Sequence, residues 1–131
     1  MPTWLLRLIE SVIAALIAIF APIGPMLLTC GMLVIVDMIT GMMAARKRKE
    51  PITSRKMKST IVKGLVYQVA IVMAFLVETY LAQHSIPVLN ITATIIGVTE
   101  LKSVYENLEV ITNKRLLNSI VKAISKPQDP T

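Results

Sequence analysis

Most of the positive charge in this chain of 131 residues lies between two long apolar runs. Eight of the fourteen Lys and Arg residues fall within residues 46–63, and the apolar runs cover residues 26–45 and 66–82. Twenty helical residues rise about 30 Å, the thickness of the hydrocarbon core of a bilayer. Both runs are therefore predicted to cross a membrane, and the basic loop between them is predicted to stay in the cytoplasm.

Composition supports a membrane protein, since 54% of the residues are hydrophobic and only 17% are charged. We expect an all-α integral membrane protein, a small bundle of about four transmembrane or interfacial helices with both termini cytoplasmic. The helices are predicted at about residues 4–21, 26–45, 60–83 and 91–112. Residues 1–113 would form a membrane helical domain, and residues 114–131 a basic amphipathic tail.

The first apolar segment, residues 4–21, is predicted to be a span or an interfacial helix. A signal peptide fits less well, because Glu10 lies where basic residues belong and Pro22 would follow the cleavage site. Pro22, Gly24 and Pro25 are expected to break the helix in an uncharged link. Lack of charge places this link on the far side of the membrane.

The segment at residues 91–112 is amphipathic in its second half. Its polar residues, spaced three or four apart, are Thr99, Lys102, Glu106, Glu109 and Asn113. With Glu100 the segment holds four charges, which are too costly for an isolated span surrounded by lipid, so the polar face should meet protein, water or headgroups. If the segment crosses, the basic residues Lys114, Arg115, Lys122 and Lys126 join the basic loop in the cytoplasm.

The tail predicts a short amphipathic helix, with Leu116, Leu117, Ile120, Val121 and Ile124 on one side. It would either lie on a lipid surface or pack as an ordinary solvated helix. The net charge of +6 suggests anionic phospholipids as partners rather than nucleic acid. The loop residues expected near lipid headgroups are Arg46, Lys47, Arg48, Lys49, Arg55, Lys56 and Lys58.

Catalysis has few groups to use in this chain. Cys30 is the only cysteine and His84 the only histidine. Neither a metal cluster nor a nucleophile with a histidine base can be assembled from them. We therefore expect no enzyme activity, no metal and no cofactor.

Polar residues inside the predicted spans are the candidate sites. An ionised Asp37 in mid-span costs about 2.5 to 3.5 kcal/mol, so it needs a partner or water. It shares a stripe with Cys30, Val34, Gly41 and Ala44, with Thr40 alongside, and this stripe should face protein. A structural hydrogen bond or ion pair is favoured over a place in an aqueous lumen or gate.

The other charged residues in or near the spans could be solvated, paired on one helix, or part of a site. Lys63 and Glu78 lie near the ends of their span, where their side chains are expected to reach the interface. Glu78 is thus better explained as solvated than as part of a site. Glu100, Glu106 and Glu109 could line a cation-attracting path between subunits, or Lys102 could simply pair with Glu106 on one helix.

Three short sequences resemble phage holins of the toxin-secretion and phage-lysis type. They are an Asp-x-x-Thr-Gly-x-x-x-Ala pattern at residues 37–45, Thr-Ser-Arg-Lys-Met-Lys at residues 53–58, and a Ser-x-x-Glu-Asn-Leu-like element at residues 103–108 that includes Asn107. The similarity covers about residues 33–111. One departure is that Tyr67 and Gln68 stand where further basic residues are typical.

The resemblance implies a small multi-pass protein of the bacterial inner membrane without enzyme activity. Such proteins form homo-oligomers and permeabilise the membrane, releasing a cell-wall hydrolase (an endolysin) or a toxin, and an antiholin is a further expected partner. The alternatives are a non-conducting interaction protein (an anchor, an antiholin-like regulator or an adaptor) and a narrow ion channel. No selectivity-filter sequence was recognised for a channel.

Overall fold

A computed structural model describes residues 1–113 and 115–125 of the chain. Every regular element in this part is helical, which confirms the predicted all-α fold. Lys114 and Lys126, two of the basic residues used above to orient the fourth segment, lie outside the described residues.

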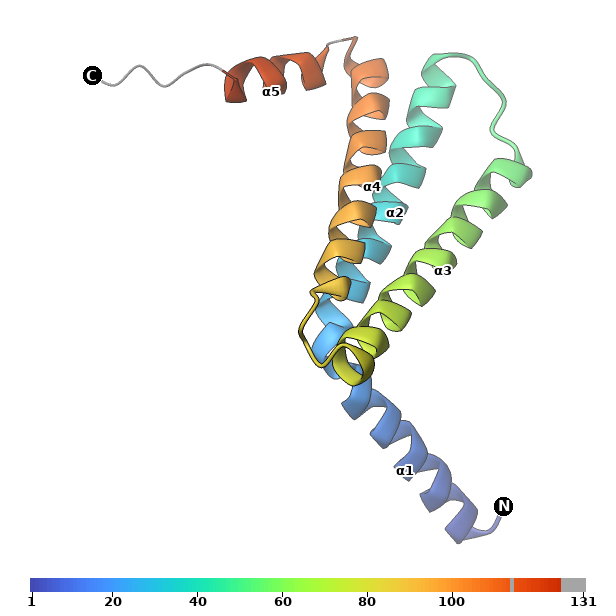
Figure 1. Cartoon of the computed structure of the whole chain (residues 1–131). Coiled ribbons are helices and arrows are strands. Elements are labelled where there is room, and N and C mark those ends of the chain that lie inside the picture. Colours follow the sequence, from blue (N-terminus) through green and yellow to red (C-terminus); the bar gives the residue numbers. More distant parts are fainter. Residues whose placement is uncertain (114, 126–131) are drawn as a thin grey trace.

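Three long helices form the bundle: α2 (Gly24–Lys47), α3 (Ser54–Leu76) and α4 (Val88–Thr112). Figure 1 shows α2 and α4 side by side, while α3 diverges from α2 toward the loop that joins them. The helices converge at the other end, where Ile23, Cys30, Ile71 and Ile96 form a buried core. The apolar core therefore closes the end of the bundle away from the basic loop.

Local sequence explains where these helices begin and end. Thr53 caps α3, since its side chain accepts a hydrogen bond from the backbone N–H of Lys56. Arg46 and Lys47 occupy the last turn of α2, where positive charge stabilises the helix dipole. Helix α3 continues into one wide helical turn, η2 (Val77–Leu81), before the short link to α4.

The α-helix is interrupted near residues 22–25, as expected, but by a 3₁₀ turn rather than by a non-helical link. After α1 (Thr3–Phe20), a 3₁₀ turn, η1 (Ala21–Ile23), leads directly into α2. Pro22 and Pro25 each fall within the first two residues of a helical element, where a missing N–H is tolerated. The chain therefore stays helical through the link.

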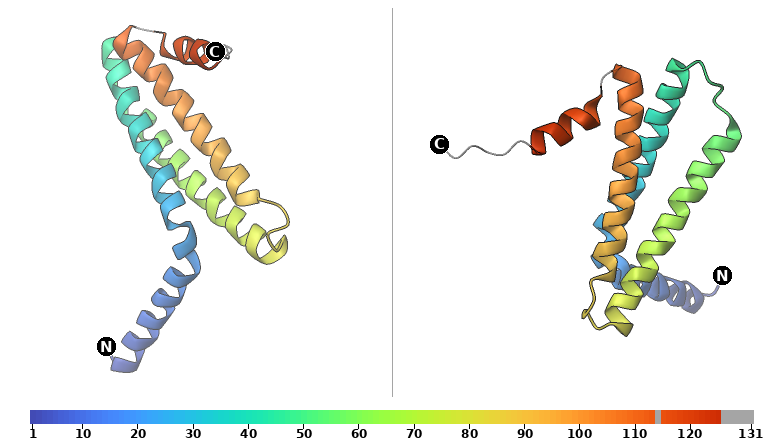
Figure 2. Two further views of the ribbon diagram at one scale, coloured as in Figure 1. Left: turned by 90° about the vertical axis from the view of Figure 1, so that its left-hand side faces the viewer. Right: turned by 45° about the horizontal axis from the view of Figure 1, so that its top comes forward.

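Helix α1 consequently does not join the bundle. Figures 1 and 2 show it projecting from the closed end, with the N-terminus far from the loop between α2 and α3. None of its residues is buried, as judged within the described part of the chain. The bundle thus has three of the four expected helices, and α1 presents its apolar side chains to whatever surrounds the molecule.

Helix α5 (Leu116–Ile124) runs across the direction of the bundle at the opposite end from α1. Asn113 makes this corner, because its left-handed backbone (φ 54°) ends α4. The tail helix therefore begins at the level where the basic loop leaves the bundle.

Two continuous helical stretches of the described chain are long and apolar enough to cross a membrane. They are Thr3–Lys47 and Ser54–Leu81, which contain 18-residue windows with mean hydropathies of 2.3 and 2.0. The first stretch includes both α1 and α2. Helix α4 does not pass the same test, in keeping with its charged second half.

Candidate functional site

One lysine bridges two acids from the other helices of the bundle. The Nζ of Lys63 on α3 lies 2.9 Å from Oδ2 of Asp37 on α2 and 2.9 Å from Oε2 of Glu100 on α4. The Asp37 and Glu100 side chains are buried, with only 11% and 1% exposed. These three residues, called here the ionic triad, tie all three helices together in mid-bundle.

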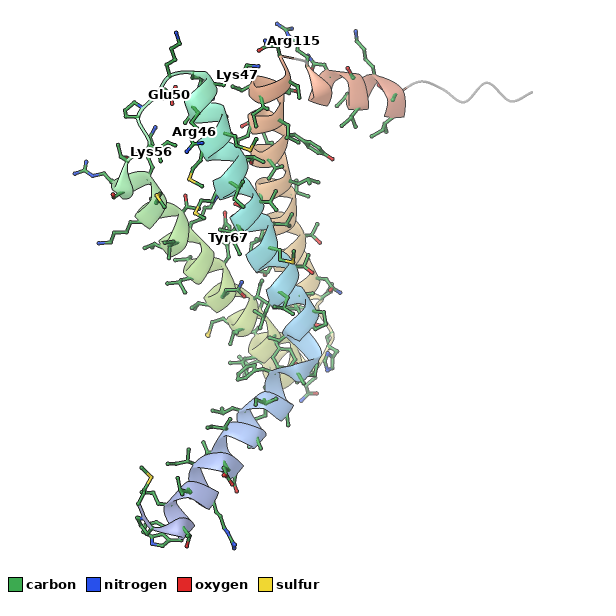
Figure 3. The ribbon with its side chains drawn as sticks, turned by 180° about the vertical axis from the view of Figure 1, so that it is seen from behind. Arg46, Lys47, Glu50, Lys56, Tyr67 and Arg115 are labelled. Carbon is green, nitrogen blue, oxygen red and sulfur yellow. The ribbon has the colours of Figure 1, made fainter. Side chains whose placement is uncertain are left out.

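Uncharged donors complete the hydrogen bonding of both acids. Ser103 and Asn107 donate to Oδ1 of Asp37, at 2.6 and 3.1 Å. The hydroxyl of Tyr67 donates to Oε1 of Glu100 at 3.0 Å, and Figure 3 shows Tyr67 between the helices. Each of the four carboxylate oxygens therefore has a partner, which greatly reduces the cost of burying two acids.

Small residues let the helices approach around the triad. A Cβ at Gly64 of α3 would lie 3.3 Å from the Cγ1 of Val34, and one at Gly41 of α2 would lie 3.6 Å from Asn107 Nδ2. Asn107 also donates to Oγ1 of Thr40 at 3.2 Å. The structure buries Cys30, Val34, Asp37 and Ala44, as the predicted stripe required.

The charges of the triad do not balance, since two acids share one lysine. With all three groups ionised, the triad carries a net charge of −1. Its carboxylate oxygens and the Lys63 ammonium nevertheless form hydrogen bonds within one chain. The triad therefore joins the three helices and leaves no open lumen between them. No cluster of potential metal ligands occurs in the described part of the chain.

A pocket of about 240 Å³ connects the triad with the basic loop. Asp37, Ser103 and Asn107 line its deep end, and Arg48 and Lys56 line it on the loop side. The divergence of α3 from α2 creates this space. A pocket with both polar and apolar walls therefore reaches Asp37 from the end of the bundle that is predicted to be cytoplasmic.

The second half of α4 also carries polar groups on its outer surface. Thr99, Lys102 and Glu106 are exposed, and Lys102 Nζ lies 3.7 Å from Glu106 Oε1. Glu109 is half-buried nearer the end of the helix. This outer polar face, defined here by Thr99, Lys102 and Glu106, points away from the ionic triad.

Glu78 has a structural role that the sequence interpretation missed. Its side chain is 15% exposed, and Oε2 accepts a hydrogen bond of 2.7 Å from the backbone N–H of Leu89. This N–H belongs to the first turn of α4, where donors lack partners within the helix. The expectation that Glu78 is simply solvated is therefore wrong: it caps α4.

The basic loop residues lie at one end of the molecule. Figure 3 shows Arg46, Lys47 and Lys56 there, together with Glu50 and with Arg115 at the start of the tail helix. Arg48 and Lys56 pair with Glu50 at 2.9 and 3.7 Å. The remaining predicted headgroup residues, Lys49, Arg55 and Lys58, are exposed.

Sequence reasoning did not identify Lys63, Tyr67 and Ser103 as site residues. Lys63 was expected to reach the interface, but Asp37 and Glu100 hold it inside the bundle. The sequence does hold a sign of this pairing, because Asp37 and Lys63 are equally far in sequence from Glu50, near the centre of the loop. Two helices joined as a hairpin bring such positions to the same depth.

The site joins two of the three sequence elements whose pattern suggested a family. Asp37, Thr40 and Gly41 of the element at residues 37–45 face Ser103 and Asn107 of the element at residues 103–108. A family model described as "Bacteriophage holin family" matches residues 14–128, most of the chain. Comparisons with curated proteins and with solved structures found no match. The match over nearly the whole length shows that this chain belongs to the bacteriophage holin family.

Proposed function

We propose that this protein is a holin that oligomerises in the bacterial inner membrane and permeabilises it to release an endolysin or a toxin. Membership of the holin family supports a membrane-permeabilising role and an inner-membrane location. Proteins of this family are generally non-enzymatic, and the proposal contains no catalytic step.

The observation that carries this proposal is the exposed polar face of α4. Elsewhere the outer surface of the bundle is largely apolar, with exposed residues such as Leu65, Val69 and Met73 on α3. An outer lysine and glutamate within a span are costly toward acyl chains and stable toward water or protein. Copies that turn Thr99, Lys102 and Glu106 toward a shared space would remove that cost and line a polar path.

The ionic triad explains why the path would run between copies rather than through one. Its carboxylates are fully bonded inside the three-helix bundle, so a single chain offers no open lumen there. A small bundle can enclose a wide hole only by placing faces from several subunits around it. The triad would keep each subunit folded while its outer face rearranges.

The topology in the membrane is part of the proposal. With α2, α3 and α4 crossing, the basic loop and the tail lie in the cytoplasm. A cytoplasmic N-terminus further requires α1 to turn back at residues 21–25, where two prolines weaken the helical hydrogen bonding. Lipid or neighbouring copies would then cover the apolar side chains of α1.

Partners follow from the same mechanism. The cell-wall hydrolase is a functional partner that passes the membrane without having to bind the holin. An antiholin would act by covering the outer polar face of α4 and delaying assembly.

The test is expression in bacteria while membrane potential and release of a cytoplasmic enzyme are followed. The double variant Lys102→Leu/Glu106→Leu is expected to insert normally but to cause neither depolarisation nor release. The matched control Lys102→Glu/Glu106→Lys keeps both charges in exchanged positions and should still permeabilise. Release by the leucine variant with unchanged timing would refute the proposed lining.

Outcomes for the unsubstituted protein separate the classes of function. Depolarisation with enzyme release supports a holin that forms large holes. Depolarisation alone indicates a small pore or an ion channel. Neither result, with insertion confirmed, indicates a non-conducting interaction protein.

A further inference from the structure

The tail helix α5 has an apolar face that no described part of the chain covers. Ile120, Val121 and Ile124 are 38%, 60% and 79% exposed. At 100° per residue these three share one side of the helix and Lys122 lies on the opposite side, while Arg115 directly precedes the helix. A helix of nine residues is marginal in water, so it needs a surface to pack on.

Helix α5 follows the turn at Asn113 and runs across the end of the bundle (Figure 1). The left-handed Asn113 turns the chain at the end of α4, and Lys47 of α2 donates a hydrogen bond to the backbone carbonyl of Ile111. This bond links the ends of α2 and α4 next to the turn at Asn113. Figures 1 and 2 show α5 directed sideways, away from the bundle, rather than folded back against it.

The positive charges around α5 favour binding to a negatively charged surface. The basic loop contributes seven lysines and arginines at this end, and Arg115 and Lys122 add to them. Glu50 offsets part of this charge through Arg48 and Lys56. Each lysine or arginine near an anionic lipid surface favours binding by about fivefold.

We propose that α5 lies flat on the anionic inner leaflet, with Ile120, Val121 and Ile124 in the boundary between headgroups and acyl chains. Arg115 and Lys122 then face the lipid phosphates and the water above them. This inference rests on the membrane orientation given under the proposed function. It adds the partner of the tail, a phospholipid surface rather than solvent or a protein groove.

A surface-bound α5 also sets the depth of the outer polar face. Lys102 precedes the end of α4 at Thr112 by about ten residues, or roughly 15 Å of helix. That distance is about half the hydrocarbon thickness of a bilayer. The anchor would therefore hold Lys102 deep in the inner half of the membrane, where it needs a polar partner from another copy.

The experiment uses the full chain in vesicles of phosphatidylcholine, alone or mixed with phosphatidylglycerol. Cys30→Ala removes the native thiol, and single cysteines at positions 118 to 124 carry a spin label. Collisions with dissolved oxygen report contact with lipid, and collisions with a water-soluble nickel complex report contact with water. The readout does not depend on permeabilisation.

In the mixed vesicles, labels at Val121 and Ile124 are expected to favour oxygen, and the label at Lys122 to favour nickel. Replacing both Arg115 and Lys122 with glutamine should lower the membrane-bound fraction of α5 relative to the free fraction by about 30-fold. Equal access of nickel to all positions in anionic vesicles would overturn the proposal in favour of a solvated helix. Protection that is independent of lipid charge, with spin–spin broadening between copies, would overturn it in favour of a protein partner.

A failure of this test is distinguishable from a failure of the proposed function. If α5 is solvated while the chain still releases a cytoplasmic enzyme, only the anchor is wrong. If α5 is lipid-bound and the chain never permeabilises, the anchor stands and the holin mechanism does not.

Discussion

Replacing Lys63 with methionine is expected to destabilise the bundle more than replacing either of its acidic partners. Methionine keeps most of the length of the side chain but leaves Asp37 and Glu100 without a cation. Removing one member of a buried ionic group costs about 3 to 5 kcal/mol. Because the Lys63 side chain is 33% exposed, we expect a loss near the lower end, about 3 kcal/mol.

The net charge of the triad predicts the order of the other variants. Asp37→Asn leaves the pair of Lys63 and Glu100 intact, so its cost should be about 1 to 2 kcal/mol, from weakened hydrogen bonds. The triple variant Asp37→Asn/Lys63→Met/Glu100→Gln buries no charge. It should be within about 1 kcal/mol of the unsubstituted protein, since neutral groups of similar shape often replace buried ion pairs without loss.

The assay is unfolding in mild detergent micelles by added dodecyl sulfate, followed by circular dichroism. Lys58→Met is the matched control, because Lys58 is an exposed lysine on the same helix. If Lys63→Met unfolds at the same point as Lys58→Met, the triad does not hold the helices together. A triple variant as unstable as Lys63→Met would show that the loss arises from packing rather than from unpaired charge.

Two further pairs of substitutions test the packing around Gly64 and the turn at Asn113. Gly64→Val should cost about 1 to 3 kcal/mol in the same unfolding titration, because the added carbons meet Val34; Gly97→Ala, at a position where a Cβ meets nothing within 4 Å, should be neutral or stabilising. Asn113→Val should cost about 1 to 2 kcal/mol, since a β-branched residue is strained at φ 54°, and Asn113→Gly should not destabilise the corner. Equal stability of Gly64→Val and Gly97→Ala, or of the two Asn113 variants, would contradict these assignments.

Hydropathy alone predicts the helical fold and the hairpin of α2 and α3, because long apolar runs and a basic loop leave few other structures. The burial of Asp37 also follows from the cost of an exposed carboxylate in mid-span. Which residue pairs with Asp37 depends on which side chains of α3 and α4 lie at the same depth in the bundle. The equal spacing of Asp37 and Lys63 about Glu50 contains that information, although the charge of Lys63 alone suggests the interface.

Other features depend on geometry that the sequence pattern does not determine. Pro22 and Pro25 read as helix breakers, yet their positions in the first turns of two helical elements keep the chain helical there. Glu78 reads as an end-of-span acid, but the wide turn η2 brings it to the first turn of α4. In both cases the local backbone geometry determines the structure that forms.

The most direct test of the account is the labelling of a single cysteine on the outer polar face of α4. Thr99→Cys in the Cys30→Ala protein would be exposed in living cells to a thiol reagent that cannot cross membranes, before and after enzyme release begins. Leu65→Cys, on the exposed apolar surface of α3, is the matched control. The account predicts that position 99 reacts only once release has begun and that position 65 does not react. Release of the enzyme with position 99 still unreactive would contradict a hole lined by α4.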